Sequence, residues 1–243
     1  MDKITQQTVL ITGANKSIGF ETARQLAQKD YYVFIGSRDA ARGQQAVESL
    51  RAEGLASVEL LEVDVSSEAS VAAARVRLGE RTDRLDVLIN NAGIMGGQPQ
   101  QPSTLPDETL RRVFETNLFG AVRMIRHFLD LLQKADAPRI INVTSDLASL
   151  TLHNDPSWIY YKYKGGAYGP SKTALNAYTV ALAYELGERF RVNMVNPGHT
   201  ATDFNQHRGT KKVEEAVRII VQTAMDTNGP TGKFISDYGV SPW

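Results

Sequence analysis

Residues 8–19 read Thr-Val-Leu-Ile-Thr-Gly-Ala-Asn-Lys-Ser-Ile-Gly, and an amphipathic helical pattern follows at once. The first five residues form a short β-branched-rich run that is typical of a strand. A glycine-rich turn at this point lets the backbone bend tightly and lets a pyrophosphate approach the helix N-terminus, where free N–H groups attract anions. An ordinary strand–helix connection is the alternative for such a turn taken alone. Its position between the first strand and the first helix favours a phosphate site.

Strands and helices alternate along the chain. Short apolar runs predict strands at residues 8–12, 32–37, 58–63, 87–90, 139–144 and 192–196. Helical patterns occupy residues 19–29, 40–53, 67–81, 109–135, 171–189 and 211–227. This alternation requires parallel pairing through right-handed crossovers, with helices on both faces. We therefore expect residues 1–243 to form a single α/β domain, a doubly wound parallel sheet of Rossmann type, which binds ligands beyond the carboxyl ends of its strands.

The bulk composition argues against several classes of protein. Of 243 residues, 42% are hydrophobic and 22% are charged, and 27 basic residues balance 27 acidic ones. This balance gives no reason to expect a nucleic-acid or membrane partner. There is no cysteine, so disulfides, thiolate metal sites and a thiol nucleophile are excluded, and we expect no metal. The polar start MDKITQQ leaves no room for a signal peptide and no apolar stretch approaches the roughly 20 residues of a membrane span, so we expect a soluble cytoplasmic protein.

Tyr168 and Lys172 stand four residues apart in Tyr-Gly-Pro-Ser-Lys. On a helix they share one face, and Pro170 suits a first turn, so the helix is predicted to start near Tyr168. A free phenol, with a pKa of about 10, is a poor acid–base catalyst at neutral pH. An ammonium about 4 Å away contributes on the order of 4 kcal/mol toward the phenolate as an upper bound, enough to lower the pKa by about two units. Two exposed helix residues are the ordinary interpretation of this pair alone.

Three further motifs accompany this pair. Ser145 follows the fifth predicted strand, Asn117 lies in Phe-Glu-Thr-Asn, and Asn-Asn-Ala-Gly follows the fourth strand at residues 90–93. Together with the glycine turn, they resemble the short-chain dehydrogenase/reductase family, whose motifs are TGxxxGxG, NNAG and an Asn–Ser–Tyr–Lys tetrad. The resemblance covers nearly the whole chain. One departure is Ser17, which replaces the middle glycine of the turn and would be strained if that position has a positive φ.

The resemblance implies a role for each member of the tetrad. Tyr168 donates a proton to a carbonyl oxygen during reduction, or removes one from an alcohol during oxidation, and Ser145 hydrogen-bonds and orients the same oxygen. Lys172 lowers the pKa of the tyrosine and binds the nicotinamide ribose, and Asn117 holds a water that links Lys172 to solvent. The hydride itself belongs to the cofactor.

The end of the second strand bears on the choice of dinucleotide. An NAD site generally needs a carboxylate at the ribose 2′-hydroxyl, whereas a 2′-phosphate needs a nearby arginine. The family register places Ser37 at the acidic position and Arg38 after it, and Lys16 adds a second cation, which favours NADP(H). Asp39 keeps an NAD-dependent alcohol dehydrogenase open as an alternative. The resemblance implies a cofactor site formed by Gly13, Asn15, Lys16, Ser17, Ile18, Gly19, Arg38, Asp64, Val65, Asn91, Ala92, Gly93, Tyr168, Lys172, Pro197, Gly198, Thr200 and Thr202.

Loops are expected to set the substrate. Residues 94–106, 147–166 and 203–212 are mixed polar and aromatic, with no basic cluster that demands an anionic substrate, so we expect an uncharged aldehyde or ketone. The aromatic run at residues 158–163 indicates either a pocket wall or a contact surface. His199 is discounted as a catalytic base, because the family mechanism needs no histidine.

Ser145 and Tyr168 are 23 residues apart, which exceeds the common family spacing. The extra residues resemble an insertion in NADPH-dependent carbonyl reductases, which share the Thr-Gly-Ala-Asn-Lys opening. We therefore expect a carbonyl reductase-like, NADP(H)-dependent oxidoreductase that acts on a small-molecule carbonyl or alcohol. The alternatives are a non-catalytic NADP(H)-binding sensor and an isomerase, epimerase or dehydratase of the extended branch of the superfamily. The physiological substrate, the direction of reaction and the choice between monomer and homo-oligomer stay open.

Overall fold

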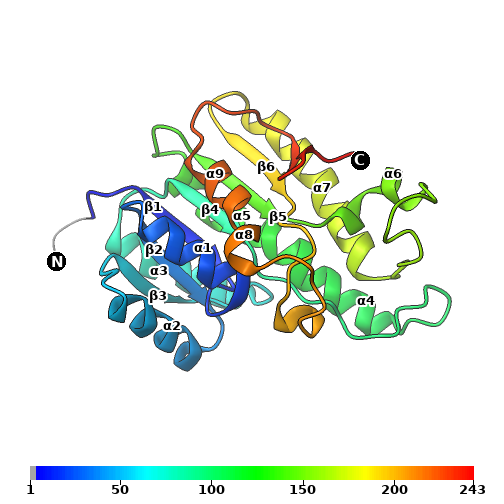
Figure 1. Cartoon of the computed structure of the whole chain (residues 1–243). Coiled ribbons are helices and arrows are strands. Elements are labelled where there is room, and N and C mark those ends of the chain that lie inside the picture. Colours follow the sequence, from blue (N-terminus) through cyan, green and yellow to red (C-terminus); the bar gives the residue numbers. More distant parts are fainter. Residues whose placement is uncertain (1–3) are drawn as a thin grey trace.

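One eight-stranded sheet runs through the molecule (Figure 1). The computed structural model describes residues 4–243. The strand order is β3-β2-β1-β4-β5-β6-β7-β8, and neighbouring strands are parallel except for β7 and β8. The strands are β1 (Thr8–Thr12), β2 (Tyr32–Ser37), β3 (Val58–Glu62), β4 (Val87–Asn90), β5 (Arg139–Val143), β6 (Arg191–Val195), β7 (Phe234–Ser236) and β8 (Gly239–Val240).

Helices cover both faces of the sheet, as the alternation predicts. Side chains of α1, α2 and α9 form one apolar core with the sheet, and those of α3, α5 and α7 form a second core on the other face. Val9 and Ile11 of β1 belong to the first core and Leu10 to the second. Burial on both faces is typical of parallel strands, and the predicted fold class is confirmed. The helices are α1 (Ser17–Ala27), α2 (Ala40–Ala52), α3 (Glu68–Arg81), α4 (Asp107–Phe114), α5 (Gly120–Leu132), α6 (Leu150–His153), α7 (Tyr168–Leu186), α8 (Val213–Ala216) and α9 (Arg218–Met225).

Several elements differ from the sequence prediction. The segment predicted as one helix over residues 109–135 consists of α4 and α5 joined by a π-helical turn, Glu115–Phe119. The last predicted helix, over residues 211–227, starts later, at Val213, and is divided into α8 and α9. The hydrophobic pattern does not predict β7 and β8, because strands of three and two residues are too short to show a period. Pairing with β6, far back along the chain, determines where β7 forms.

The strand order reverses direction beside β1, which is where doubly wound sheets form a crevice at their carboxyl edge. The chain runs outward from β1 through β2 to β3 and then returns to β4 on the other side of β1. Doubly wound sheets bind ligands at such a reversal of direction. The glycine turn follows β1 and the Asn-Asn-Ala-Gly segment overlaps the end of β4. Both motifs therefore border the same crevice.

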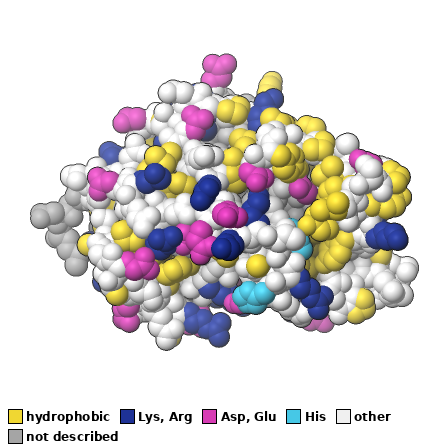
Figure 2. Space-filling model, viewed as in Figure 1, with side chains coloured by type: hydrophobic (Ala, Val, Ile, Leu, Met, Phe, Trp, Pro, Cys, Tyr) yellow, Lys and Arg dark blue, Asp and Glu magenta, His cyan; other side chains and the backbone are white. Residues whose placement is uncertain are grey.

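Figure 2 shows hydrophobic side chains gathered on the side of the molecule that carries α6 and α7. Ile159, in the loop between these helices, is 82% exposed, and Tyr184 on α7 is 91% exposed.

None of the helices within residues 4–243 has the length and hydrophobicity that a membrane span requires. In the same part of the chain, no three His, Cys, Asp or Glu side chains form a group that could hold a metal ion.

Candidate active site

The glycine-rich turn is held tightly against the end of β4. Gly13 has a φ of +64°, which favours glycine, and a Cβ there would lie 3.1 Å from the Cα of Ala92. A Cβ on Gly19 would lie only 2.5 Å from the carbonyl oxygen of Gly13. The side-chain amide of Asn91 donates to the carbonyl oxygens of Thr12 and Gly13 at 2.9 and 3.2 Å. The turn therefore leaves no room for a side chain at Gly19.

Ser17, the first residue of α1, has a φ of 52°. The strain predicted for a serine at this position is thus confirmed, and a left-handed backbone costs on the order of 1 kcal/mol for such a residue. Asn15 and Ile18 flank it and are partly buried. Lys16, the residue before α1, contributes no side-chain capping hydrogen bond. The first N–H groups of the helix can therefore serve a pyrophosphate, which fits a dinucleotide at this turn.

Lys16 forms an ion pair with Asp203, in the loop after β6. Lys16 Nζ lies 2.9 Å from Asp203 Oδ2, and both side chains are 55% exposed. His207 Nε2 lies 3.0 Å from the other oxygen of this carboxylate. The hydrogen bond and charge of Lys16 hold the pKa of Asp203 below its ordinary value. Such exposed pairs contribute only about 0–1 kcal/mol, so a doubly charged phosphate can compete for the lysine.

The end of β2 leaves Arg38 exposed to solvent. The hydroxyl of the preceding Ser37 is turned to the backbone and donates to the carbonyl oxygen of Asp39 at 2.8 Å. The carboxylate of Asp39 caps α2 by accepting a hydrogen bond from the N–H of Arg42 at 3.0 Å. The carboxylate that would have served a ribose 2′-hydroxyl is therefore engaged at a helix terminus.

Asp64 and Val65 follow β3, close to Arg38. The carboxylate of Asp64 accepts hydrogen bonds from the N–H and the hydroxyl of Ser66 at 2.9 and 2.6 Å. Partial burial acts to raise the pKa of Asp64, but these bonds and the charge of Arg38 hold it below its ordinary value. Val65 is buried, and its side chain fills the space that a Cβ on Gly120 would need. Both residues thus lie at the β2–β3 end of the crevice.

Asn117 joins two segments of the site. Its Oδ1 accepts from the N–H of Ile94 at 2.8 Å, and its Nδ2 donates to the carbonyl oxygen of Ile94 and to Ser171 Oγ, both at 3.0 Å. Both ends of the side-chain amide are therefore engaged within the protein, on the π-helical turn that contains Asn117. A Cβ on Gly93 would lie 3.3 Å from Asn117 Oδ1 and 3.6 Å from Lys172 Nζ. Gly93, Asn117 and Lys172 are therefore neighbours.

Lys172 is buried behind Tyr168, with only 4% of its surface exposed. Its Nζ donates to the carbonyl oxygen of Val143, at the end of β5, at 2.8 Å. The same atom lies 6.0 Å from the centre of the Tyr168 ring. Burial lowers the pKa of Lys172 to about 8, because an ammonium loses its hydration inside the protein.

Tyr168 begins α7, where the sequence predicts the start of that helix. Burial raises the pKa of its phenol, and a hydrogen bond with Ser145 opposes that rise. The direction is opposite to the one expected from Lys172, because burial raises the pKa of the phenol by more than the hydrogen bond with Ser145 lowers it. Ser145 Oγ also accepts from the N–H of Leu147 at 3.2 Å, which fixes the hydroxyl beside the phenol.

The segment after β6 is a compact loop at the same edge. Gly198 has a φ of +79°, and its N–H donates to Asn196 Oδ1 at 2.9 Å. Thr200 Oγ1 donates to the carbonyl oxygen of Gly198 at 3.1 Å. Thr202 and Asn205 cap a short 3₁₀ turn reciprocally. The structure therefore keeps together the predicted cofactor residues of this segment, which are Pro197, Gly198, Thr200 and Thr202.

Side chains that no motif identifies surround the phenol. Phe204 packs edge-on against Tyr168, with the ring centres 5.4 Å apart. Tyr163 is close enough to Tyr168 that its phenol acts to raise the pKa of Tyr168. Tyr163 Oη accepts a hydrogen bond from Gln98 Nε2 at 2.9 Å and donates to Met95 Sδ at 3.6 Å. These contacts come from the loops after β4, β5 and β6. The three loops predicted to set the substrate therefore meet at Tyr168.

The aromatic run packs against the loop after β6. Tyr160 Oη lies 3.1 Å from His199 Nδ1, and the two rings pack edge-on with centres 5.3 Å apart. Trp158 packs edge-on against Tyr160 at 5.5 Å, while Ile159 between them faces solvent. His199 is thus engaged by Tyr160, and this contact connects the loop after β5 to the loop after β6.

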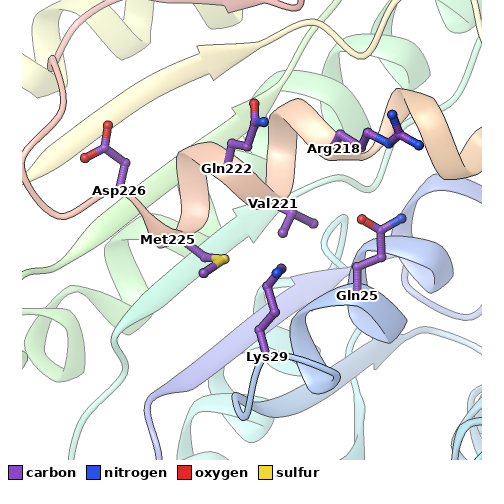
Figure 3. A pocket seen from close by; sticks show the side chains of 7 residues that line it. All are labelled: Gln25, Lys29, Arg218, Val221, Gln222, Met225 and Asp226. Atoms are coloured by element: carbon purple, nitrogen blue, oxygen red, sulfur yellow. The ribbon is translucent and has the colours of Figure 1, made fainter.

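A separate groove lies between α1 and α9 (Figure 3). Helices that follow parallel strands run back toward the start of the strand, so the C-terminal end of α1 lies at the edge opposite the glycine turn. The groove shares no residue with the predicted site. It has a volume of about 550 Å³ and is lined by Gln25, Lys29, Arg218, Val221, Gln222, Met225 and Asp226.

The fold and the site together define a class of protein. A glycine turn with an open helix N-terminus lies at the switch point of the sheet, and a tyrosine–serine–lysine group, whose lysine is buried, lies at the same carboxyl edge. This arrangement is typical of dinucleotide-dependent oxidoreductases.

Comparison with known proteins identifies the family. A family model described as short chain dehydrogenase matches residues 7–213. A short-chain dehydrogenase of Penicillium roqueforti, anuI, is 35% identical over 98% of this chain and 96% of its own length. The (+)-neomenthol dehydrogenase of Arabidopsis thaliana is 33% identical, with 99% of each chain covered. An NADPH-bound carbonyl reductase from chicken fatty liver superposes with a TM-score of 0.84 at 26% identity, covering 99% of this chain and 100% of that one. The chain belongs to the short-chain dehydrogenase/reductase family.

Proposed function

We propose that this protein reduces an aldehyde or a ketone to an alcohol with NADPH, or catalyses the reverse reaction with NADP⁺. The observation that carries the proposal is the group at the carboxyl edge of the sheet in which the phenol of Tyr168 is hydrogen-bonded to Ser145 and lies beside the buried Lys172. A phenol that is hydrogen-bonded to a hydroxyl and backed by an ammonium can bind and protonate a carbonyl oxygen. A non-catalytic sensor has no use for such a group.

The residues of the crevice fit NADP(H). The glycine turn and the N-terminus of α1 would hold the pyrophosphate. Arg38, exposed beyond β2, would hold the 2′-phosphate, with Lys16 as the second cation, while Asp39 is engaged in capping α2. Lys172 and the segment after β6 would hold the nicotinamide end. When bound, the cofactor supplies or accepts the hydride.

Each member of the tetrad has a task in this proposal. Tyr168 Oη donates its proton to the carbonyl oxygen during reduction and takes a proton from the alcohol in the reverse direction. Ser145 Oγ donates a second hydrogen bond to the same oxygen. Lys172, held by the carbonyl of Val143, stabilises the negative charge that develops on Tyr168 as the proton leaves. Asn117 keeps Ile94 and Ser171 in place on either side.

The surroundings of the phenol support an uncharged carbonyl substrate with an apolar body. Phe204, Tyr163 and Met95 present aromatic and thioether surface beside Tyr168. Such surface binds apolar groups and gives no partner to a carboxylate or phosphate. The names of the neomenthol dehydrogenase and the carbonyl reductase point to an alcohol and a carbonyl compound as substrates of those relatives.

A screen of aldehydes and ketones, read as loss of NADPH absorbance, tests the reaction. We expect turnover with at least one uncharged carbonyl compound, and slower turnover when NADH replaces NADPH. A purified, folded protein that binds NADPH but reduces no member of a broad panel would contradict the proposal.

Arg38→Ala tests the cofactor preference. A charge-assisted hydrogen bond contributes about 1.5–3 kcal/mol, so the Kd for NADPH should rise by about tenfold or more while the Kd for NADH stays within about twofold. Lys29→Ala, in the groove between α1 and α9, removes a positive charge at the opposite edge and should change neither value. Equal weakening of NADPH and NADH binding by Arg38→Ala would refute the phosphate role.

A further inference from the structure

Gln100 is a buried glutamine whose neighbours in the chain are exposed. It follows β4 within residues 94–106, and only 4% of its surface is exposed, while Gln98, Pro99 and Gln101 beside it are exposed. Glutamine is seldom buried unless its amide is fully hydrogen-bonded. Its hydrogen bonds therefore show how the loop after β4 is held in place.

The side-chain amide of Gln100 makes four hydrogen bonds. Its Oε1 accepts from the backbone N–H groups of Ala167 and Tyr168, both at 3.2 Å. Its Nε2 donates to the carbonyl oxygens of Met95 and Gly97, the second at 3.0 Å. Each end of the amide thus binds a different segment, the start of α7 on one side and the loop after β4 on the other.

These contacts replace the missing cap of the catalytic helix. The N-cap residue of α7 is Ala167, whose side chain supplies no capping hydrogen bond, so the N–H groups at this terminus need an acceptor from elsewhere. Gln100 supplies it from 67 residues earlier in the chain. One of the two N–H groups belongs to Tyr168 itself.

Two glycines make this approach possible. A Cβ on Gly165 would lie 3.0 Å from Gln100 Oε1, and a Cβ on Gly166 would lie 3.0 Å from the Cα of Pro102. The N–H of Gly166 also donates to the backbone carbonyl of Gln100 at 2.8 Å. The chain that leads into Tyr168 is therefore packed directly on the Gln100 loop.

We propose that Gln100 is a positioning residue for Tyr168, an inference that rests on the proposed reductase function. By holding the backbone of Tyr168 at the first turn of α7, it fixes the phenol against Ser145. By binding Met95 and Gly97 at the same time, it holds the loop after β4, which faces the substrate, at a fixed position relative to the phenol.

Gln100→Leu and Gln101→Leu form a matched pair of variants. Gln100→Leu removes all four side-chain bonds at similar volume, whereas Gln101→Leu changes an exposed neighbour. A small displacement of a reacting group costs about tenfold to a hundredfold in rate, so kcat for carbonyl reduction should fall by about tenfold or more in Gln100→Leu. The Kd for NADPH should stay within about twofold. The solvent deuterium isotope effect on kcat should rise, because proton donation by Tyr168 becomes slower.

Gln100→Glu separates positioning from mere packing. A carboxylate keeps the two accepted bonds but turns its second oxygen toward the carbonyl oxygens of Met95 and Gly97, and protonation restores a donor there. The kcat of Gln100→Glu should therefore rise toward the wild-type value as the pH falls. Wild type and Gln100→Leu should lack this additional pH-dependent limb.

Amide hydrogen exchange over residues 165–172 supplies a readout that does not depend on activity. Exchange should accelerate in Gln100→Leu and stay unchanged in Gln101→Leu. Unchanged exchange, or faster exchange with an unchanged kcat and isotope effect, would overturn the positioning role. A wild-type protein that reduces no carbonyl compound would instead refute the proposed function, and the exchange result would still report on the contact.

Discussion

The proposed cofactor half and the proposed substrate half of this site are built in different ways. Around the glycine turn, backbone groups and small side chains of β1 and β4 are packed so closely that Gly19 admits no Cβ. Around Tyr168, long side chains such as Phe204 and Tyr163 come from separate loops and stay partly exposed, at 40% and 42%. The first half is thus specified by short motifs, and the second by contacts between distant segments.

This contrast separates what the protein does from what it acts on. A pyrophosphate needs backbone N–H groups and space, which glycines at a fixed spacing provide in any sequence context. A substrate wall needs only surface of suitable shape, which many different residues can supply. On the proposed function, short local motifs therefore encode the chemistry, whereas tertiary packing encodes the selectivity.

Gly19→Ala should have the largest effect, because it places a methyl group in the closely packed glycine turn. Its methyl group would meet the Gly13 carbonyl oxygen at 2.5 Å and the Asn91 amide nitrogen at 2.6 Å, both rigidly held. We expect the Kd for NADPH to rise by about a hundredfold and the protein to lose about 1–3 kcal/mol of stability, measured by fluorescence titration and thermal melting. Gly79→Ala in α3 is the control, since its methyl group would meet only the flexible end of Arg75. Equal effects of the two substitutions would contradict the difference in packing.

The rate of reduction should depend on Lys172 through pH. The pKa of its ammonium lies below the ordinary value, at about 8, so the positive charge is lost as the pH rises through that value. The phenol of Tyr168, whose pKa is raised, stays protonated in this range. We expect kcat/KM for carbonyl reduction to be constant below about pH 8 and to fall by up to tenfold per pH unit above it. A profile that instead rises through pH 8 would show that Lys172 does not act as a cation.

Phe204→Ala should alter substrate binding and leave cofactor binding unchanged. Its ring covers one edge of Tyr168, so its removal should raise KM for bulky apolar ketones by about fivefold to tenfold, which corresponds to about 1–1.4 kcal/mol of lost aromatic contact. The Kd for NADPH should not change. Tyr184→Ala, at a residue that is 91% exposed, is the control. Steady-state kinetics with a small and a bulky ketone measure this change. An equal rise in KM for both ketones would contradict the role of Phe204 in binding the apolar part of the substrate.

Ser17→Gly should have the smallest effect. Glycine removes the strain of a φ of 52°, but it also increases the entropy of the unfolded chain, so the net gain in unfolding free energy should be about 0–1 kcal/mol. Denaturant titration measures this gain, and a clear loss of stability would show that the serine hydroxyl holds the turn.

Much of the cofactor half could be predicted from the sequence. The strand, the turn and the helix are contiguous in residues 8–27, and even the strain at Ser17 follows from its register in the motif. The start of α7 at Tyr168 follows from Pro170 in the same way. Local patterns carry this information because the residues that interact are close in the chain.

The remaining features depend on contacts that no local pattern records. Lys16 pairs with Asp203 across 187 residues, and Gln100 binds the backbone of α7 across 67. β7 has only three residues and forms by pairing with β6. The pKa of Tyr168 was expected to fall beside Lys172, but it rises, because burial depends on the whole fold.

The central claim, that Tyr168 is the proton donor of an NADPH-dependent carbonyl reductase, is tested most directly by single-turnover reduction with Tyr168→Phe. The variant keeps the ring and its contact with Phe204 but lacks the hydroxyl. The account predicts that the hydride-transfer rate, followed as loss of NADPH absorbance under saturating ketone, falls by about a hundredfold or more, with the Kd for NADPH within about twofold of the wild-type value. A Tyr168→Phe variant that transfers hydride at the wild-type rate would contradict the claim.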